Sequence, residues 1–200
     1  MRITLTGVAI VIAALALTLL PVGRGRRSGD VAAARVGGAA RVEIPFSIQR
    51  DHRELHDELA RAIRVGGKTG GAAEKVEKLL RPHLLKEEQY ALPPLGMLRA
   101  FSGGEVPANA AEVLAMTERF RAEYPKMLEE HDAIFAAVGD LLVAARAEHQ
   151  DDTAAFARDL LRHAETEEEI LYPTTVLIGE YLKVALAKDG RGTSAVVHNP

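Results

Sequence analysis

The chain contains the same histidine and glutamate pattern twice. In each copy a histidine is followed by glutamates four and five positions later and by a proline ten positions later, in H-L-L-K-E-E-Q-Y-A-L-P (83–93) and H-A-E-T-E-E-E-I-L-Y-P (163–173). A further histidine precedes each copy, His52 by 31 positions and His131 by 32. Residues four apart share one face of an α-helix, and an unpaired carboxylate is very costly to bury. The pattern therefore predicts helices whose inner faces hold a bound ion.

Six residues of this pattern are the candidate metal ligands. They are His52, His83, Glu87, His131, His163 and Glu167. In an antiparallel helix bundle these side chains can meet at one level, where each carboxylate bridges two cations and each imidazole binds one. Nitrogen and oxygen donors of this kind suit iron or manganese, and zinc is also possible. The sequence therefore predicts a site for a pair of metal ions.

Five further side chains lie close to the candidate ligands along the sequence. His56, one turn further along the first helix, is either an alternative ligand or a surface residue beside the site. Glu88 and Glu168 directly follow the proposed bridging glutamates and are expected either to contact the ligands or to face solvent. Tyr90 and Tyr124 could each bring a hydroxyl to the centre, although packing as a core aromatic is the simpler expectation for both.

Apolar residues recur at the spacing of an α-helix over four stretches of the chain. The stretches are residues 44–65, 76–92, 113–142 and 153–187. The chain is 48% hydrophobic but only 4% aromatic, and it is rich in alanine, leucine, glutamate and arginine, which are good helix formers. Four amphipathic helices with mostly short connections predict an all-α fold, an antiparallel up-and-down four-helix bundle.

Glycines and prolines set the expected ends of these helices. The first helix should end at residues 66–67, with the glycines at 70–71 completing the turn. The prolines at 93–94 should end or kink the second helix, and Pro125 should bend or restart the third. The apolar face of the fourth helix is expected to include Ile170.

The chain before the predicted bundle has a different character. Residues 3–22 are apolar and long enough to cross a hydrocarbon core of about 30 Å as a helix. We expect residues 1–23 to be a signal anchor that makes this a single-pass membrane protein, with a cleaved signal peptide and export as the alternative. Residues 24–43 read as a linker, 44–187 as the helical domain and 188–200 as a flexible tail.

Composition excludes several classes of function. The formal net charge is −3 and no basic helix face is present, so nucleic acid is not an expected partner. The absence of cysteine excludes disulfides, thiolate metal sites and iron–sulfur clusters. The sequence also has no phosphate-binding loop and no dinucleotide fingerprint.

A single histidine followed by HxxxEE, twice in one chain, resembles the hemerythrin-like, or HHE cation-binding, family over about residues 44–187. The segments L-P-P-L and L-Y-P after the two copies resemble the family as well. The resemblance implies a four-helix domain with a non-haem di-iron centre, in which the six candidate ligands hold two iron ions.

Two positions differ from the oxygen-carrying members of that family. Phe135 stands where the carriers have another histidine, and Glu167, four residues after its histidine, stands where they use an aspartate five residues after. The pattern is closer to the bacterial and sensory branch. The resemblance thus implies a protein that binds or senses oxygen or nitric oxide, and the alternatives are an oxidoreductase that decomposes peroxide or a protein that stores or senses iron.

Overall fold

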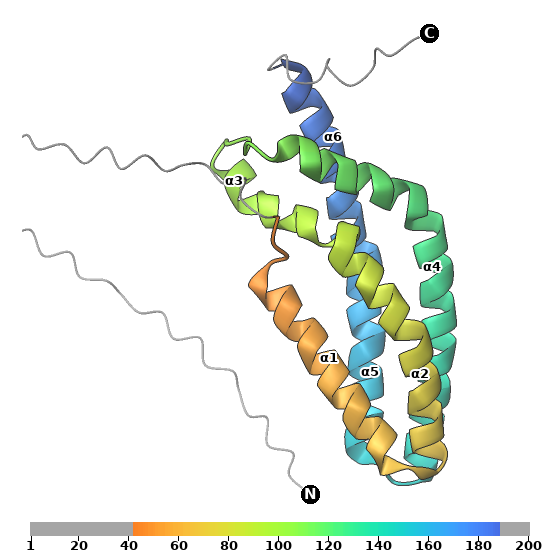
Figure 1. The fold of residues 1–200 in the computed structure, drawn as a ribbon. Coiled ribbons are helices and arrows are strands. Elements are labelled where there is room, and N and C mark those ends of the chain that lie inside the picture. Colours follow the sequence, from red (N-terminus) through yellow and green to blue (C-terminus); the bar gives the residue numbers. More distant parts are fainter. Residues whose placement is uncertain (1–41, 189–200) are drawn as a thin grey trace, which may run out of the picture. The chain divides into compact units, whose positions relative to one another are not determined.

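The structure is a computed structural model that describes residues 42–188. Within that range every regular element is helical, as the sequence predicts (Figure 1). The elements are α1 (Phe46–Val65), α2 (Gly67–Lys86), η1 (Glu87–Ala91), η2 (Pro93–Met97), α3 (Leu98–Ser102), α4 (Ala110–Ala147), α5 (Asp151–Thr166), η3 (Glu167–Leu171) and α6 (Tyr172–Lys188). Of these, η1 and η3 are π-helical turns and η2 is a 3₁₀-helix.

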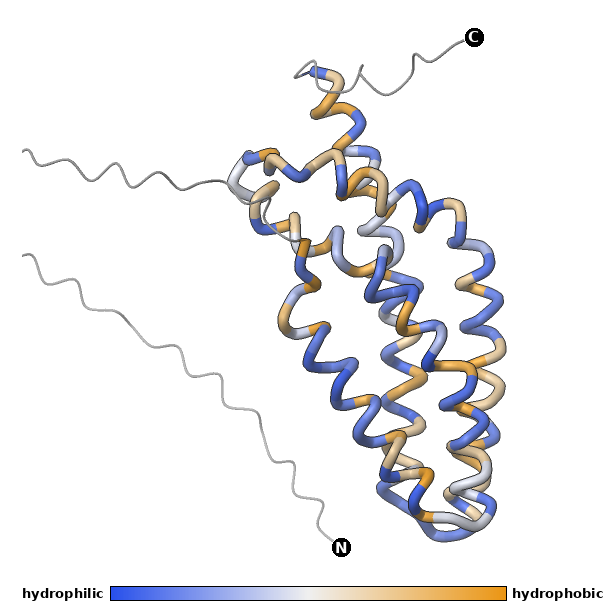
Figure 2. Tube along the Cα trace, viewed as in Figure 1, coloured by the Kyte–Doolittle hydropathy of each residue, from blue (hydrophilic) through white to orange (hydrophobic). Residues whose placement is uncertain are grey.

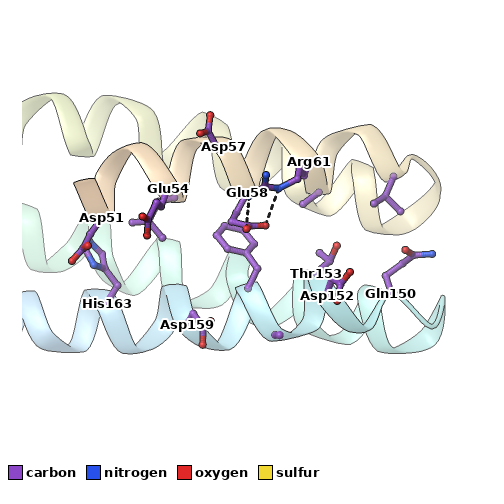
Figure 3. Close-up of a pocket in the computed structure, with 15 residues that line it drawn as sticks. Asp51, Glu54, Asp57, Glu58, Arg61, Gln150, Asp152, Thr153, Asp159 and His163 are labelled. Atoms are coloured by element: carbon purple, nitrogen blue, oxygen red, sulfur yellow. Dashed lines mark hydrogen bonds and ion pairs between the residues drawn. The ribbon is translucent and has the colours of Figure 1, made fainter. Parts of the chain in front are cut away.

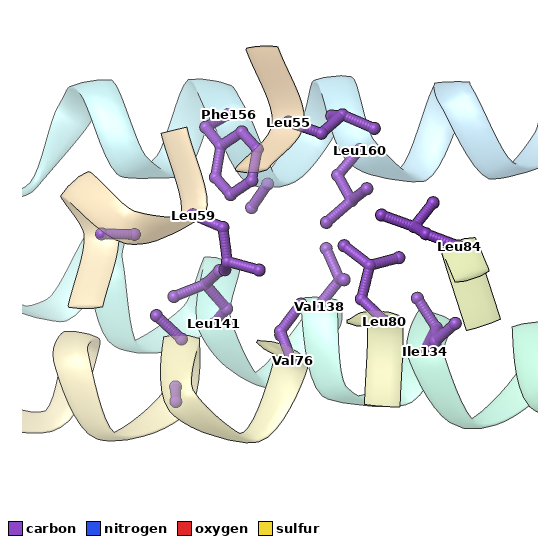
Figure 4. Packing of buried hydrophobic residues seen from close by; sticks show 14 residues of the cluster. Leu55, Leu59, Val76, Leu80, Leu84, Ile134, Val138, Leu141, Phe156 and Leu160 are labelled. Atoms are coloured by element: carbon purple, nitrogen blue, oxygen red, sulfur yellow. The ribbon is translucent and has the colours of Figure 1, made fainter. Parts of the chain in front are cut away.

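The long helices run alternately in opposite directions around a common core (Figure 1). α2 packs on α1 and α4, and α5 packs on α4 and α1, so the four form a closed bundle. Hydrophobic and hydrophilic residues alternate along each helix, as expected where only one face is buried (Figure 2). The main apolar core lies between these helices (Figure 4), and its largest members are Leu55, Leu59, Val76, Leu80, Leu84, Ile134, Val138, Leu141, Phe156 and Leu160.

Two further apolar clusters follow beyond the main core. One joins η2 and the start of α4 to α6, and it includes Leu92, Leu95, Met97, Val113, Ile178, Leu182 and Leu186. The other is smaller and consists of Tyr90, Ala91, Phe120, Met127 and Tyr172. Along α2, α4 and α5, the histidines of the sequence pattern lie at the end of the main core that faces the smaller cluster. The polar centre therefore sits between apolar layers.

The turn between the first two helices is tighter than the glycine content suggests. Gly66 ends α1 with a positive φ of 74°, but α2 already begins at Gly67, so the glycines at 70–71 are helical and the prediction that they complete the turn is wrong. A Cβ on Gly70 would lie 2.7 Å from the carbonyl oxygen of Ile63. Gly70 is therefore needed for the close approach of α1 and α2, while Gly71 has open space beside it.

A carboxylate from the neighbouring connection between α4 and α5 closes this turn (Figure 1). Glu148, just after α4, accepts hydrogen bonds from the backbone N–H groups of Lys68 and Thr69, both at 2.9 Å, and from the Thr69 hydroxyl at 2.7 Å. These bonds satisfy N–H groups that a helix N-terminus leaves free. They also lower the pKa of Glu148 to about 2, mainly through the Thr69 hydroxyl and the two backbone donors.

The prolines and the π turns change the helices near the centre. Pro125 lies inside the continuous helix α4, whereas Pro93 begins the 3₁₀-helix that follows the second helix. The fourth predicted helix is continuous from 151 to 188 but contains the π turn η3. Because that turn shifts the helix face, Ile170 is 56% exposed instead of buried, and Tyr172 is fully buried.

Two expectations about membranes and domain boundaries concern parts of the chain beyond this description. The expected signal anchor at 1–23 lies outside residues 42–188, as do most of the expected linker and tail. Within the described residues, one helix, Asp151–Lys188, is long and apolar enough to cross a membrane by length and composition alone. It packs on α4 in the bundle, so it does not establish an anchor.

Candidate metal centre

The six candidate ligands meet at one level of the bundle. α1, α2, α4 and α5 each contribute one histidine, and the two glutamates are the first residues of η1 and η3. His163 is 17% exposed, and each of the other five side chains is at most 2% exposed. These five are His52, His83, Glu87, His131 and Glu167. The repeated spacing thus brings residues from four helices together in a buried position.

The ligand atoms fall into two groups of three. One group contains His52, His163 and Glu167, and the other contains His83, Glu87 and His131. Within each group the nitrogen and oxygen atoms lie within 4.8 Å of one another, which is close enough for a metal ion to be held between them. Each group therefore offers two imidazoles and one carboxylate.

Each glutamate also reaches the other group with its second oxygen. Glu87 Oε1 is 3.5 Å from His83 Nε2, while its Oε2 is 3.8 Å from His52 Nε2. Glu167 Oε1 is 3.0 Å from His163 Nε2, while its Oε2 is 3.6 Å from His131 Nε2. A carboxylate that bridges two cations needs this division, with one oxygen for each ion.

The centre leaves ligand atoms without hydrogen-bond partners. Within residues 42–188, these buried atoms include His52 Nε2, Glu87 Oε2, His163 Nε2 and Glu167 Oε1. His163 Nε2 and Glu167 Oε1 are close enough for a hydrogen bond but are not aligned for one. Buried polar atoms are normally satisfied. Unsatisfied imidazole and carboxylate atoms in one closed place fit metal ions such as iron or manganese.

A second set of carboxylates holds the outer nitrogens of three histidines. His52 Nδ1 lies 3.1 Å from Glu88, His131 Nδ1 lies 2.8 Å from Glu168, and His83 Nδ1 lies 3.0 Å from Glu130. An ionised carboxylate only accepts hydrogen bonds, so Nδ1 donates and, in the neutral ring, Nε2 keeps its lone pair toward the centre. Carboxylates in this position are typical orienting partners of metal-binding histidines.

The structure separates the five neighbouring candidates. Glu88 and Glu168 contact candidate ligands, whereas His56 is exposed and lines a surface pocket with Glu88. Tyr90 packs in the smaller apolar cluster, with the Arg119 guanidinium 4.3 Å above its ring. Tyr124 packs edge-on against the ring of Tyr172 at 5.8 Å. Tyr90 is therefore buried and Tyr124 partly buried at the smaller apolar cluster.

Two residues of the centre were missed by the reasoning from sequence. One is Glu130, whose only signal is that it directly precedes the candidate ligand His131. The other is Tyr172, whose hydroxyl donates a hydrogen bond to Glu87 Oε1 at 2.5 Å. The Tyr172 ring stacks on His131 with centroids 5.4 Å apart. The only signal for Tyr172 in the sequence is its place directly before the proline of the second copy. In a regular α-helix that place would not face the centre, so the signal is misleading.

The metal-free centre balances its carboxylates with protons. Burial alone would lower the pKa of His52, but the carboxylates of Glu167 and Glu87 raise it to about 9. Burial also lowers the pKa values of His83 and His163, but the nearby glutamates outweigh this effect, so both pKa values are raised. Protonated histidines therefore take the place of cations beside the acids.

The two bridging candidates differ in their acidity. Burial and the charge of Glu167 raise the pKa of Glu87. Burial would raise the pKa of Glu167 too, but the close imidazoles of His163 and His52, together with the charges of His163 and His131, hold it well below its usual range. Without metal, Glu167 is thus the carboxylate that stays ionised, while Glu87 is the more easily protonated of the pair.

An acidic groove leads to the most exposed candidate ligand. A pocket of about 860 Å³ lies between α1 and α5, and its acidic residues are Asp51, Glu54, Asp57, Glu58, Asp152 and Asp159. His163 lies at one end of the groove, on the side of Asp51, and Gln150 lies at the other (Figure 3). Its lining contains one arginine, Arg61, and no lysine. The groove therefore offers a cation a favourable path to His163.

Comparison with known families agrees with this geometry. A family model described as the Hemerythrin HHE cation binding domain matches residues 46–175. Comparison with curated proteins and with solved structures finds no match. The matched segment runs from α1 into α6 and contains all six candidate ligands together with Tyr172. The chain belongs to the hemerythrin HHE cation-binding domain family.

Proposed function

We propose that this protein holds two iron ions in the centre and binds a small diatomic ligand, such as oxygen or nitric oxide, at them. His52 and His163 would hold one ion, His83 and His131 the other, and Glu87 and Glu167 would bridge the pair. Family membership supports cation binding. Mixed imidazole and carboxylate donors favour iron over magnesium or calcium, although manganese and zinc also fit such a set.

The observation that carries this proposal is the division of each carboxylate between two histidine pairs. A structural ion pair would need only one histidine for each glutamate, and it would satisfy the atoms involved. Here both glutamates contact histidines of both groups, and ligand atoms in the centre remain without hydrogen bonds. Two positive ions would satisfy all of these atoms together.

Binding of a small ligand follows from the number of donors. Six side chains, two of them bridging, do not fill the coordination of two iron ions, so bound iron would offer open positions and redox chemistry there. The chain's own residues then determine what reaches those positions. Phe135 packs edge-on to His131 at 5.9 Å and keeps that side apolar, while His163 meets the acidic groove. Small ligands would enter on the His163 side.

Peroxide decomposition is the second candidate, and the Tyr172 hydroxyl favours it. A buried phenol that already donates to Glu87 could supply a proton to a reacting ligand in the centre. Stable binding and turnover therefore depend on the same residues and must be separated by measurement.

The metal content of the purified protein tests the first part of the proposal. We expect two iron ions per chain by plasma mass spectrometry, and loss of most of that iron in the double variant Glu87→Gln with Glu167→Gln. Glu169→Gln is the matched control, since Glu169 lies in the same π turn but is exposed. Full retention of iron by the double variant would show that these glutamates do not bridge.

The reaction is tested by rapid mixing of the reduced, iron-loaded protein. A stable change in the visible spectrum on addition of oxygen or nitric oxide supports ligand binding. Continuous consumption of peroxide with many turnovers per chain supports the second candidate. Iron-loaded protein that reacts with none of the three would contradict both.

A further inference from the structure

We infer that Tyr172 is a seventh protein ligand of the centre, and that its phenolic oxygen binds the ion held by His83, His131 and Glu87. The inference rests on the proposed function, because it requires metal in the centre. It makes the two ions unequal and assigns the small-ligand position to the other one.

The Tyr172 hydroxyl lies among all three ligand atoms of its group. It is 2.5 Å from Glu87 Oε1, 3.1 Å from His83 Nε2 and 3.3 Å from His131 Nε2. The residue is fully buried, and its ring is held by stacking on His131. No rearrangement is needed to bring this oxygen to the ligand group.

With His83 and His131 neutral, the form in which a histidine binds metal, this position has too few protons for hydrogen bonding alone. His83 and His131 direct Nδ1 at Glu130 and Glu168, so each neutral ring turns a lone pair toward the Tyr172 oxygen. Glu87 Oε1 is also an acceptor. One hydroxyl proton therefore faces three acceptors and can satisfy only one of them. A cation among the four atoms would satisfy all of them at once.

The spacing of the atoms also fits one coordination shell. Neighbouring ligands on an octahedral ion with bonds of about 2.1 Å lie about 3 Å apart. The contacts of the Tyr172 oxygen, from 2.5 to 3.3 Å, are of this size, and so is the 3.5 Å between His83 Nε2 and Glu87 Oε1. Binding would break the phenol O–H bond, form a metal–oxygen bond and release the proton to solvent.

The other half of the centre has no such oxygen from the repeated pattern. The position in the first copy that corresponds to Tyr172 is Leu92, nine residues after the histidine in each case, and Leu92 is buried in an apolar cluster. The ion held by His52 and His163 would therefore keep more open positions. It is also the ion beside the groove, because His163 lines that pocket. Small ligands are thus expected to bind there.

The test uses the full-length chain loaded with ferric iron. A phenolate bound to ferric iron gives a visible charge-transfer band and enhances tyrosine ring vibrations in resonance Raman spectra. We expect both signals in the wild type and their loss in Tyr172→Phe, which keeps the ring stacked on His131. Tyr124→Phe, whose ring packs on Tyr172, is the matched control and should keep both signals.

The outcomes separate this inference from the proposed function. Iron-loaded wild type without tyrosine vibrations would overturn the role of Tyr172 and leave the iron site intact. Wild type that binds no iron would overturn both. If Tyr172→Phe does not fold, signals that are present in the wild type and retained in Tyr124→Phe support the inference. Loss of the signals in Tyr124→Phe would assign the phenolate to Tyr124 and overturn the inference.

Discussion

Glu130 on α4 accepts a hydrogen bond from His83 Nδ1 on α2 at 3.0 Å, and the same carboxylate forms an ion pair with Lys86. The contact fixes the orientation of the His83 ring, because the nitrogen that donates to Glu130 cannot face the centre. Lys86 holds the carboxylate in place and, with His83, lowers the pKa of Glu130 against the effect of burial. A charged acceptor is therefore maintained behind this candidate ligand.

Replacing Glu130 by glutamine should weaken metal binding without removing any ligand. Loss of such an outer carboxylate typically costs about 10- to 100-fold in metal affinity, and competition against a chelator would measure it. Glu129→Gln is the control, since Glu129 is the exposed neighbour on the same helix. Equal affinities for the two variants would show that Glu130 does not orient His83.

Neutralising the groove near His163 should slow metal uptake but not change the final metal content. In Asp51→Asn with Asp159→Asn, the local attraction for a cation is reduced, and we expect ferrous iron to load about 10-fold more slowly at low salt. Stopped-flow loading rates would show this. Asp132→Asn with Asp140→Asn removes the same charge from exposed positions on α4, and an equal slowing in that variant would contradict entry through the groove.

The metal-free protein should become less stable as the pH rises from neutral to alkaline values. The pKa of His52 is about 9 in the fold, against 6.5 for an ordinary histidine. A raised folded pKa gives stability that is complete below about pH 6.5 and is lost as the pH rises through about 9, here about 3 kcal/mol. Urea unfolding at several pH values would measure the loss.

Metal should reverse that dependence, because only deprotonated histidines bind it. The stability that iron adds should therefore grow between pH 6.5 and 9, while the metal-free protein weakens. His52→Asn should flatten the metal-free curve over this range. An unchanged slope in that variant would show that other groups cause the pH dependence.

Adjacent glycines in α2 should respond in opposite ways to substitution by alanine. Gly70→Ala places a methyl group against the Ile63 carbonyl and should destabilise the protein by about 1–3 kcal/mol. Gly71→Ala meets open space within a helix and should stabilise it by up to about 1 kcal/mol. Thermal unfolding of the two variants tests the pair, and equal shifts would argue against the close approach of α1 and α2.

Spacing along the chain predicts the helical fold and the six converging side chains, because both depend on the regular repeat of an α-helix. The same rule explains the failures. Five residues of α-helix rotate a side chain about 140° past a full turn, so Tyr172 should lie far from the face of Glu167. The π turn between them brings it back. Sequence spacing alone does not reveal where a helix widens.

Glu130 escaped prediction for a different reason. It acts on a histidine 47 positions away on another helix, and its own neighbour in sequence, His131, takes its carboxylate from Glu168 instead. Which acid supports which histidine depends on how the helices pack side by side. The prediction that the glycines at 70–71 complete a turn was wrong for a related reason. A close contact between helices and a turn both favour glycine, and only the packing of the helices distinguishes them.

The two π turns, η1 and η3, each add one residue to a helix without adding a turn. Deleting a single residue from Glu167–Leu171 would therefore convert the π turn into a regular α-helical turn and leave α6 close to its present orientation, because no turn of the helix is lost. Ile178 and Leu182 would stay in their apolar cluster, and Tyr172 would stay at the centre. The same deletion within the regular part of α6 would rotate the residues after it by about 100°. A one-residue deletion in the π turn should therefore do less harm than a one-residue deletion further along α6.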